Sequence, residues 1–211
     1  MSGERTGMSG EQAGTSGERT GPSVDQMLRD ALPALGRATR EACAASGPEE
    51  ALRHLTATAP ALLGDKDAHR RPGALKPGER QFSVCGVFAV TADAREHLLV
   101  AEVGFPPEQH RLRIDIGLAH PGWVFQHRKP LLLANTDLDA DFKQILKTAR
   151  MGSALYAPML WKGELLGQLV LASQARYTYG QVDLDVLVTF AEVAAALWIA
   201  HDGPGFLRRL D

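Results

Sequence analysis

Two cysteines, Cys43 and Cys85, are the side chains of this sequence that could act as thiol nucleophiles. A thiolate that reduces a substrate needs a second thiol to complete its cycle, so the two cysteines would have to meet. Cys85 lies within the apolar run Phe82–Val90, where a cysteine usually behaves as a small hydrophobic side chain. Two cysteines are also too few for a disulfide framework or a CxxC metal site. We therefore expect no catalytic residue, and thiol chemistry stays an alternative only if the first helix brings Cys43 close.

The seven histidines are the next residues that could carry chemistry, as ligands of a metal or a haem. His110, His120 and His127 are scattered, without an HxxxH helical pair or a carboxylate cluster at ligand spacing. Ser153 lacks the GxSxG pattern of a nucleophilic serine. We expect no metal site, and ordinary polar or capping roles for these histidines.

The segment Gly117–Trp123, GLAHPGW, predicts the start of a short helix and with it a binding site. A helix N-terminus leaves backbone N–H groups without partners and carries about half a positive charge. The small residues Ala119 and Gly122 allow close approach, so a small anion or a carboxylate-bearing ligand is the natural guest. The side chains expected to complete this site are Trp123, Tyr156 and His120. In the alternative interpretation, Trp123 belongs to the core, Gly122 only packs, and water caps the helix.

Composition limits the classes of protein to which the chain can belong. Its 211 residues are 45% apolar, enough for one full core and little more. A net charge of −2 gives no electrostatic reason to expect nucleic acid or acidic membranes as partners. No apolar run approaches the roughly 18 residues of a membrane span, and the N-terminus has no apolar leader. We expect a soluble, cytoplasmic domain.

The chain divides into four parts by composition. Residues 1–21 are three copies of a seven-residue unit, MSGERTG, MSGEQAG and TSGERTG, which have almost no apolar side chains to bury. We expect a disordered tail over 1–22, N-terminal helices and a polar connector over 23–80, a core over 81–203, and a C-terminal tail over 204–211.

Three helices are expected from their start signals and their apolar spacing. Capping-box patterns at Ser23–Gln26, Ser46–Glu49 and Thr178–Gln181 each precede a run of apolar residues at helical spacing. The third helix is the longest and runs to Ala200. Pro33 lies inside the first pattern and should kink or split that helix.

The strands are expected mainly between these helices. The pair Lys162-Gly163 separates two apolar arms and predicts a tight hairpin over 153–173. The other expected strands are Phe82–Val90 in the centre, His97–Val103 as its return, an alternating edge strand over 111–116, and a short strand at Leu131–Ala134. A short helix is expected at Asp141–Arg150. This order predicts an α+β fold: a central antiparallel sheet, the terminal helices on one face, and short helices and loops on the other.

From about Phe82 to Ala200 the chain resembles a GAF domain, a relative of PAS domains that senses small molecules. The pieces that carry the resemblance are CGVF at Cys85–Phe88, GLAHPGWV at Gly117–Val124, RKPLLLAN at Arg128–Asn135, APML at Ala157–Leu160, GELLGQLVL at Gly163–Leu171, and DxxxL at Asp183–Leu187. The resemblance implies a six-stranded antiparallel sheet with a ligand pocket between the sheet and the short helices. It also implies homodimers through the terminal helices.

Individual positions extend the resemblance. Leu118 and Ala119 match positions that touch ligand in cyclic-nucleotide-binding relatives, and Gly86 and Phe88 match the pocket face of the first strand. The N-K…F…D-E signature of those relatives is missing, with Ala172-Ser173 in place of N-K. No cysteine follows Cys85, which disfavours covalent bilin attachment. The identity of any ligand or cofactor therefore stays unknown.

The resemblance and the missing motifs together favour a sensory or regulatory module that binds a small molecule and is not an enzyme. No output domain is recognised, so a signal would pass to a separate signalling protein or through self-association. Two alternatives remain: a free methionine sulfoxide reductase of the GAF type, and a structural dimerisation module whose pocket is filled by its own side chains.

A homodimer is expected because the longest helix carries two apolar stripes and the sheet can cover only one. The first stripe is Leu184, Leu187, Val188, Ala191, Ala194, Ala195 and Trp198; the second is Val186, Phe190, Val193 and Leu197. The first helix can supply the remaining cover from the same chain or from a partner.

Overall fold

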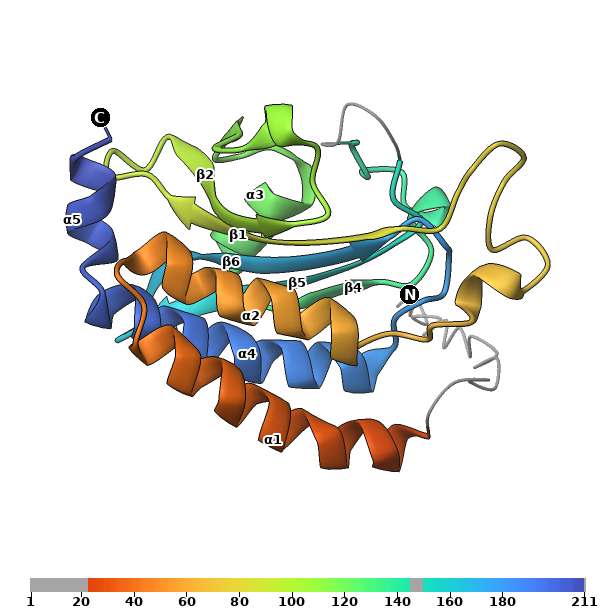
Figure 1. Cartoon of the computed structure of the whole chain (residues 1–211). Coiled ribbons are helices and arrows are strands. Elements are labelled where there is room, and N and C mark those ends of the chain that lie inside the picture. Colours follow the sequence, from red (N-terminus) through yellow and green to blue (C-terminus); the bar gives the residue numbers. More distant parts are fainter. Residues whose placement is uncertain (1–22, 145–149, 211) are drawn as a thin grey trace, which may run out of the picture.

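The computed structural model describes residues 23–144 and 150–210, which form three layers (Figure 1). The middle layer is a six-stranded antiparallel sheet in the order β3-β2-β1-β6-β5-β4, which confirms the expected fold class. The strands are β1 (Ser83–Val90), β2 (Glu96–Val103), β3 (Arg113–Asp115), β4 (Leu131–Leu133), β5 (Ser153–Trp161) and β6 (Glu164–Ser173). The expected tail over 1–22 lies outside the described residues.

The hairpin β5–β6 has the turn that its sequence predicts. Trp161 pairs with Glu164, which leaves Lys162 and Gly163 as a two-residue loop. Both have positive φ angles, 51° and 83°, the combination of a type I′ turn. The turn twists with the strands, and the pairing continues to Ser153 and Ser173.

One face of the sheet is covered by α2 (Pro48–Leu62) and α4 (Gln181–Ala200), and α1 (Val24–Cys43) packs on the outer side of these two helices (Figure 1). Their apolar side chains share one core with the sheet, including Leu52, Leu55, Leu187 and Trp198. In α4 the first stripe packs inward, and Phe190 and Leu197 of the second are buried as well. The first helix therefore supplies part of the expected cover within the same chain.

One of the three expected side-chain caps forms where the sequence predicts it: Ser23 caps α1 and accepts a hydrogen bond from the Gln26 N–H at 3.2 Å. Helix α2 begins at Pro48, but its cap is Gly47 without a side-chain hydrogen bond, one residue later than the expected Ser46. At α4 the cap is Gly180, whose N–H donates to Asp183 at 2.9 Å, so the box lies two residues later than expected. Pro33 does not split α1: it is exposed, where water can serve the carbonyl that its missing N–H leaves free.

Two segments differ from expectation more clearly. Residues 141–144 of the expected helix Asp141–Arg150 form a turn and irregular backbone, and the rest of that helix lies outside the described residues except Arg150, which is not helical. The region expected as a C-terminal tail contains α5 (Gly203–Arg208). Leu207 of α5 is buried and Phe206 packs edge-on against Trp198, so apolar contacts that the sequence spacing did not reveal hold this end.

The other face of the sheet carries α3 (Ala119–His127) and loops, over a second apolar core. Gly122 brings α3 very close to the preceding turn, because a Cβ at this position would lie 2.3 Å from the Gly117 carbonyl carbon. Gln168 on β6 donates to the Pro121 carbonyl at 3.2 Å, beside the fully buried His97. Burial lowers the pKa of His97 to about 4, so this imidazole is neutral at ordinary pH.

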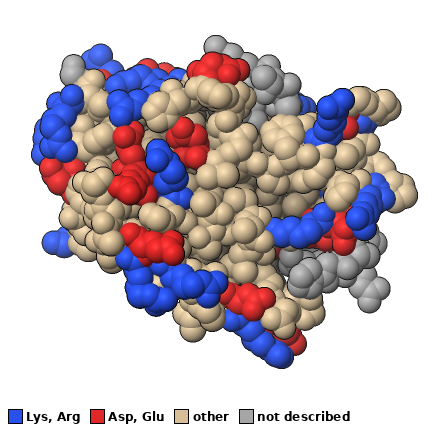
Figure 2. All heavy atoms as spheres, in the orientation of Figure 1, with Lys and Arg blue, Asp and Glu red and all other residues tan. Residues whose placement is uncertain are grey.

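The connector over 64–80 is less exposed than its polar composition suggests. Ala68 and Ala74 are buried against Ala175, and Asp65 is buried in an ion pair with Arg71. On the molecular face in Figure 2, positive and negative side chains alternate rather than gather into a patch of one sign. Among the described helices, none is long and apolar enough to cross a membrane.

Candidate functional site

A cavity of about 460 Å³ lies at the N-terminal end of α3. Its lining combines the start of α3, one turn further along that helix, the first residue of β4, and the segment after β4. The lining residues are Gly117, Ala119, His120, Trp123, Gln126, Leu131, Asp139, Asp141 and Lys143. We call this space the α3 cavity.

The backbone at the start of α3 offers hydrogen-bond donors to the α3 cavity. The N-cap Leu118 makes no side-chain cap, and the first intrahelical bond runs from the Gly122 N–H to the Leu118 carbonyl at 3.0 Å. Pro121 has no N–H, so the orphan donors are those of Ala119 and His120. Ala119 has a φ angle of 47°, a left-handed conformation that is strained for alanine and recurs at functional sites.

His120 is the most constrained polar side chain of the cavity wall. Its Nε2 lies 3.2 Å from Asp139 Oδ2, and its ring packs against Tyr156 and Phe142 at centroid distances of 6.0 and 5.7 Å. The residue is 7% exposed, and its Nδ1 has no hydrogen-bond partner among the described residues. A buried ring nitrogen without a partner is rare in folded proteins and favours an additional polar guest near it.

The residues predicted for the site separate into three groups. Ala119, His120 and Trp123 line the α3 cavity. Phe88 and Tyr156 instead line a second, smaller cavity of about 40 Å³. The remaining predicted residues, Gly86, Leu118 and Gly122, line neither cavity.

Packing accounts for the two glycines that the site prediction included. A Cβ on Gly86 would lie 2.7 Å from Leu99 Cδ1, and the tighter contact of Gly122 with Gly117 is described above. At Gly122 the neighbouring atoms are backbone, so this position needs glycine, whereas at Gly86 the Leu99 side chain would have to shift. Trp123 is half-buried and stacks on His127 at 4.3 Å; it lines the α3 cavity and also packs against the apolar core of this face.

Sequence reasoning missed the charged wall of the α3 cavity. Asp139, Asp141 and Lys143 follow one another at every second position in the segment DADFK, and the alternation was the available signal. That segment was expected as a helix from Asp141, which would have pointed these side chains in different directions. The irregular backbone lets all three reach the same space.

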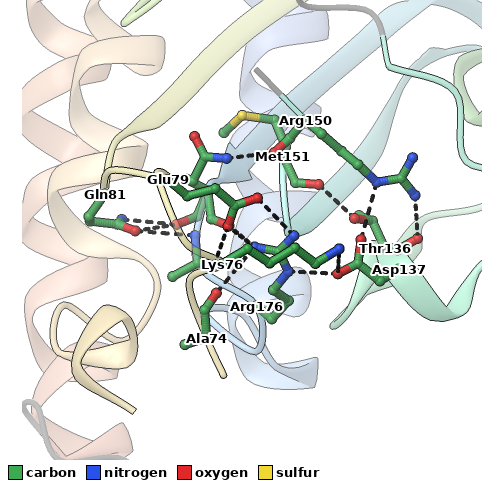
Figure 3. Close-up of polar contacts among 12 residues, drawn as sticks. Ala74, Lys76, Glu79, Gln81, Thr136, Asp137, Arg150, Met151 and Arg176 are labelled. Atoms are coloured by element: carbon green, nitrogen blue, oxygen red, sulfur yellow. Dashed lines mark hydrogen bonds and ion pairs between the residues drawn. The ribbon is translucent and has the colours of Figure 1, made fainter. Parts of the chain in front are cut away.

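An ion network beside this segment fixes where it lies (Figure 3). The Arg176 side chain, 1% exposed, binds Glu79 and donates from Nε to Asp137 Oδ2 at 2.9 Å. Lys76 and Arg150 also reach Asp137, at 2.8 and 3.3 Å. The hydrogen bond from Arg176 is the main cause that lowers the pKa of Asp137 to about 2. The network joins the connector, the segment after β4 and the loop between β6 and α4.

Arg150 links the network to the wall of the α3 cavity. Its Nη2 donates to the Thr136 carbonyl at 2.9 Å, and its guanidinium lies over the Phe142 ring, 4.6 Å from the centroid. Phe142 in turn packs against His120. Asp139, which holds His120, follows Asp137 by two residues. Through Arg150 and Asp137, the network therefore holds in place the segment that carries Asp139 and Asp141.

The cysteines lie away from both cavities. Cys85 is fully buried in the core between the sheet and the helical layer, and this burial raises the pKa of its thiol far above the ordinary range. Cys43 is exposed at the last residue of α1. Over residues 23–144 and 150–210, no three histidine, cysteine or acidic side chains are grouped so that they could hold a metal ion.

Comparison with known families identifies the fold. The family model described as GAF domain matches residues 74–198, more than half of the chain. The chain belongs to the GAF family. This match confirms the resemblance noted in the sequence. Within this GAF domain, the α3 cavity lies at the short helix α3, which packs over the sheet.

Solved structures agree with this assignment at the level of the fold. The GAF domain of a phosphoenolpyruvate-protein phosphotransferase from Coxiella burnetii is 24% identical, with a TM-score of 0.69 over 88% of this chain and 99% of that one. Free methionine-R-sulfoxide reductase from Neisseria meningitidis, solved with its substrate, is 15% identical, with a TM-score of 0.63 over 88% and 96%. A search of curated proteins finds no match.

Proposed function

We propose that this GAF domain is a regulatory module whose small-molecule ligand occupies the α3 cavity. The observation that carries the proposal is the cavity itself, an open space of about 460 Å³ against a helix N-terminus. Small-molecule sites typically measure about 300–1,000 Å³ and present a few convergent polar groups. Ligand occupancy would be passed to a separate signalling protein or through self-association.

The lining favours a carboxylate ligand with a hydrogen-bond donor beside the carboxylate. The orphan N–H groups of Ala119 and His120 and the ammonium of Lys143 attract the anionic group. His120 already engages Asp139, whereas Asp141 is exposed at the same cavity and accepts hydrogen bonds. A 2-hydroxy acid presents both functions on adjacent carbon atoms.

Removing the cavity cation is expected to weaken binding of such an acid. Lys143→Met should raise the Kd for lactate about two- to fivefold, the range for one exposed charge pair. Lys129→Met removes the same charge near the other end of α3, outside the cavity, and should leave the Kd unchanged. Isothermal titration calorimetry measures both constants.

Equal effects of the two lysine variants would mean that only net charge matters and that the acid does not bind in the α3 cavity. A second measurement needs no chosen ligand: native and denatured mass spectra of the purified protein reveal any small molecule that co-purifies. No co-purified molecule and no binding of small carboxylates would overturn the proposed function.

The two alternatives receive less support from the geometry. A thiol-based reductase needs cysteines at its substrate pocket, whereas Cys85 is buried on the helical side of the sheet and Cys43 ends α1. A purely structural module whose own side chains fill the pocket does not account for an open space of about 460 Å³.

A homodimer through the terminal helices is proposed as the assembly. On α1, Leu28 is 45% and Leu32 77% exposed, one helical turn apart, and Val186 and Val193 on α4 are half-buried. Apolar side chains that recur on one helix face favour a further helical partner. A second copy of this chain presents the same surface and can cover it by two-fold symmetry.

Light scattering at micromolar concentration is expected to give twice the 22.8 kDa mass of one chain. The double substitution Leu28→Lys, Leu32→Lys places like charges on the proposed contact and should return the protein to the monomer mass. Two further variants are compared by the same measurement. Ala196→Lys adds a lysine at an exposed residue of α4, and Leu28→Lys alone adds one charge to the α1 contact instead of two. A monomeric wild-type protein would contradict this assembly.

A further inference from the structure

A second cavity lies on the same face of the sheet and is not used by the proposed carboxylate site. It measures about 40 Å³ and lies between strands β1, β5 and β6 and the segment after β4. The residues that line it are Val84, Phe88, Phe105, Phe142, Lys143, Gln144, Met151, Ala154, Tyr156, Val170 and Ala172. We call it the apolar cavity.

Among the described residues that line the apolar cavity, most are apolar, and the polar groups are those of Lys143, Gln144 and Tyr156. Val84, Phe88, Ala154 and Ala172 are at most 5% exposed, and their side chains leave the sheet on the same face. Burial, and to a lesser degree the charge of Asp139, raise the pKa of Tyr156 far above its ordinary range, so the phenol stays neutral. A cavity with such walls excludes water and accepts hydrocarbon.

The two cavities adjoin each other. Lys143 lines both of them, and the rings of Tyr156 and Phe142 in the apolar cavity pack against His120 of the α3 cavity. A molecule with its polar group at the start of α3 therefore has hydrocarbon-lined space next to it, past the Lys143 side chain. About three methylene-sized groups fill about 40 Å³, counting one water-sized group per 10–15 Å³.

We infer that the ligand of this domain is amphiphilic: a short-chain carboxylic acid, carrying a donor group beside the carboxylate, whose hydrocarbon end enters the apolar cavity. The inference rests on the proposed function, because the α3 cavity must hold the carboxylate. It adds the selectivity: the α3 cavity recognises the acid, and the apolar cavity measures the chain length.

The test is a titration with straight-chain 2-hydroxy acids from glycolate to 2-hydroxyoctanoate. Each methylene that enters the apolar cavity should tighten the Kd about fourfold. The gain should stop after about three of them, when the cavity is full. Calorimetry measures the tighter members and ligand-observed NMR the weaker ones.

Two substitutions change the apolar cavity in opposite directions and leave the α3 cavity intact. Ala172→Val fills it and should end the gain at shorter chains, whereas Met151→Ala enlarges it and should extend the gain to longer chains. Circular dichroism checks that each variant is folded, and one folded variant suffices for the comparison.

The outcomes separate the two proposals. If glycolate and its longer homologues bind with the same Kd, or if neither variant moves the optimum, the apolar cavity takes no part and the inference is wrong while the proposed function stands. If no acid of the series binds, the inference is wrong, and the proposed function is overturned as well when the mass spectra show no co-purified molecule. A chain-length optimum that shifts with the volume at residues 151 and 172 supports the inference.

Discussion

Arg176→Met is expected to lower the free energy of unfolding by about 3 kcal/mol, the lower end of the range for breaking a buried ion pair. The guanidinium is 1% exposed and joins Glu79 to Asp137. Methionine fills a similar space and leaves Glu79 without its cation, whereas Asp137 keeps Lys76 and Arg150. The midpoint of thermal unfolding should fall by about 6–12 °C for a chain of this length. Urea titration and calorimetry measure both quantities.

The control for this prediction is an Arg–Asp ion pair on the surface of the same protein, where both side chains are exposed to water. Arg209 lies 3.2 Å from Asp202, with side chains 62% and 66% exposed, and Arg209→Met should cost at most about 1 kcal/mol. Similar losses in the two variants would show that burial of the Arg176 network does not matter.

Acid gives an independent check of the same network. The pKa of Asp137 is lowered to about 2, first by the hydrogen bond from Arg176, whereas an unfolded aspartate titrates near 3.9. Its contribution to stability is therefore complete above about pH 4 and is lost as the pH falls through 2. In Arg176→Met the loss between these values should be smaller, because the carboxyl is less strongly held.

The sequence predicts best those elements whose signals are local. The Lys162-Gly163 turn, the cap at Ser23 and the central strand Phe82–Val90 each follow from a few adjacent residues, and the structure has all three. The antiparallel sheet with helices on one face follows from their order. Periodicity and turn chemistry are properties of short segments, so one sequence is enough to read them.

The charged wall and its support depend on contacts between distant segments. Arg176 and Glu79 are 97 residues apart in the sequence, and no local sequence pattern near either residue predicts their ion pair. The sequence also could not predict on which face of the sheet the Cys85 side chain lies, because this depends on the register of β1. The short helix that begins near Gly117 could be predicted, but not that Asp139 would reach back to His120.

Gly122→Ala is the substitution expected to disturb the site most directly. Its new Cβ would lie 2.3 Å from the Gly117 carbonyl carbon and 2.4 Å from the oxygen. Backbone atoms cannot rotate away, so the start of α3 must move off the Gly117 turn. We expect a loss of about 2–3 kcal/mol in the free energy of unfolding, at the upper end for overpacking.

Gly36→Ala is the matched control, because it makes the same change inside a helix where the nearest atom is an ordinary 3.8 Å away. Alanine in place of glycine should stabilise α1 by about 1 kcal/mol, so the two variants are predicted to have opposite signs. Urea titration of both variants measures the difference. If Gly122→Ala stabilises the protein as Gly36→Ala does, α3 has room to shift freely. The donors of Ala119 and His120 are then not held against the cavity by packing. A loss confined to Gly122→Ala means that the close contact with Gly117 fixes the position of these donors.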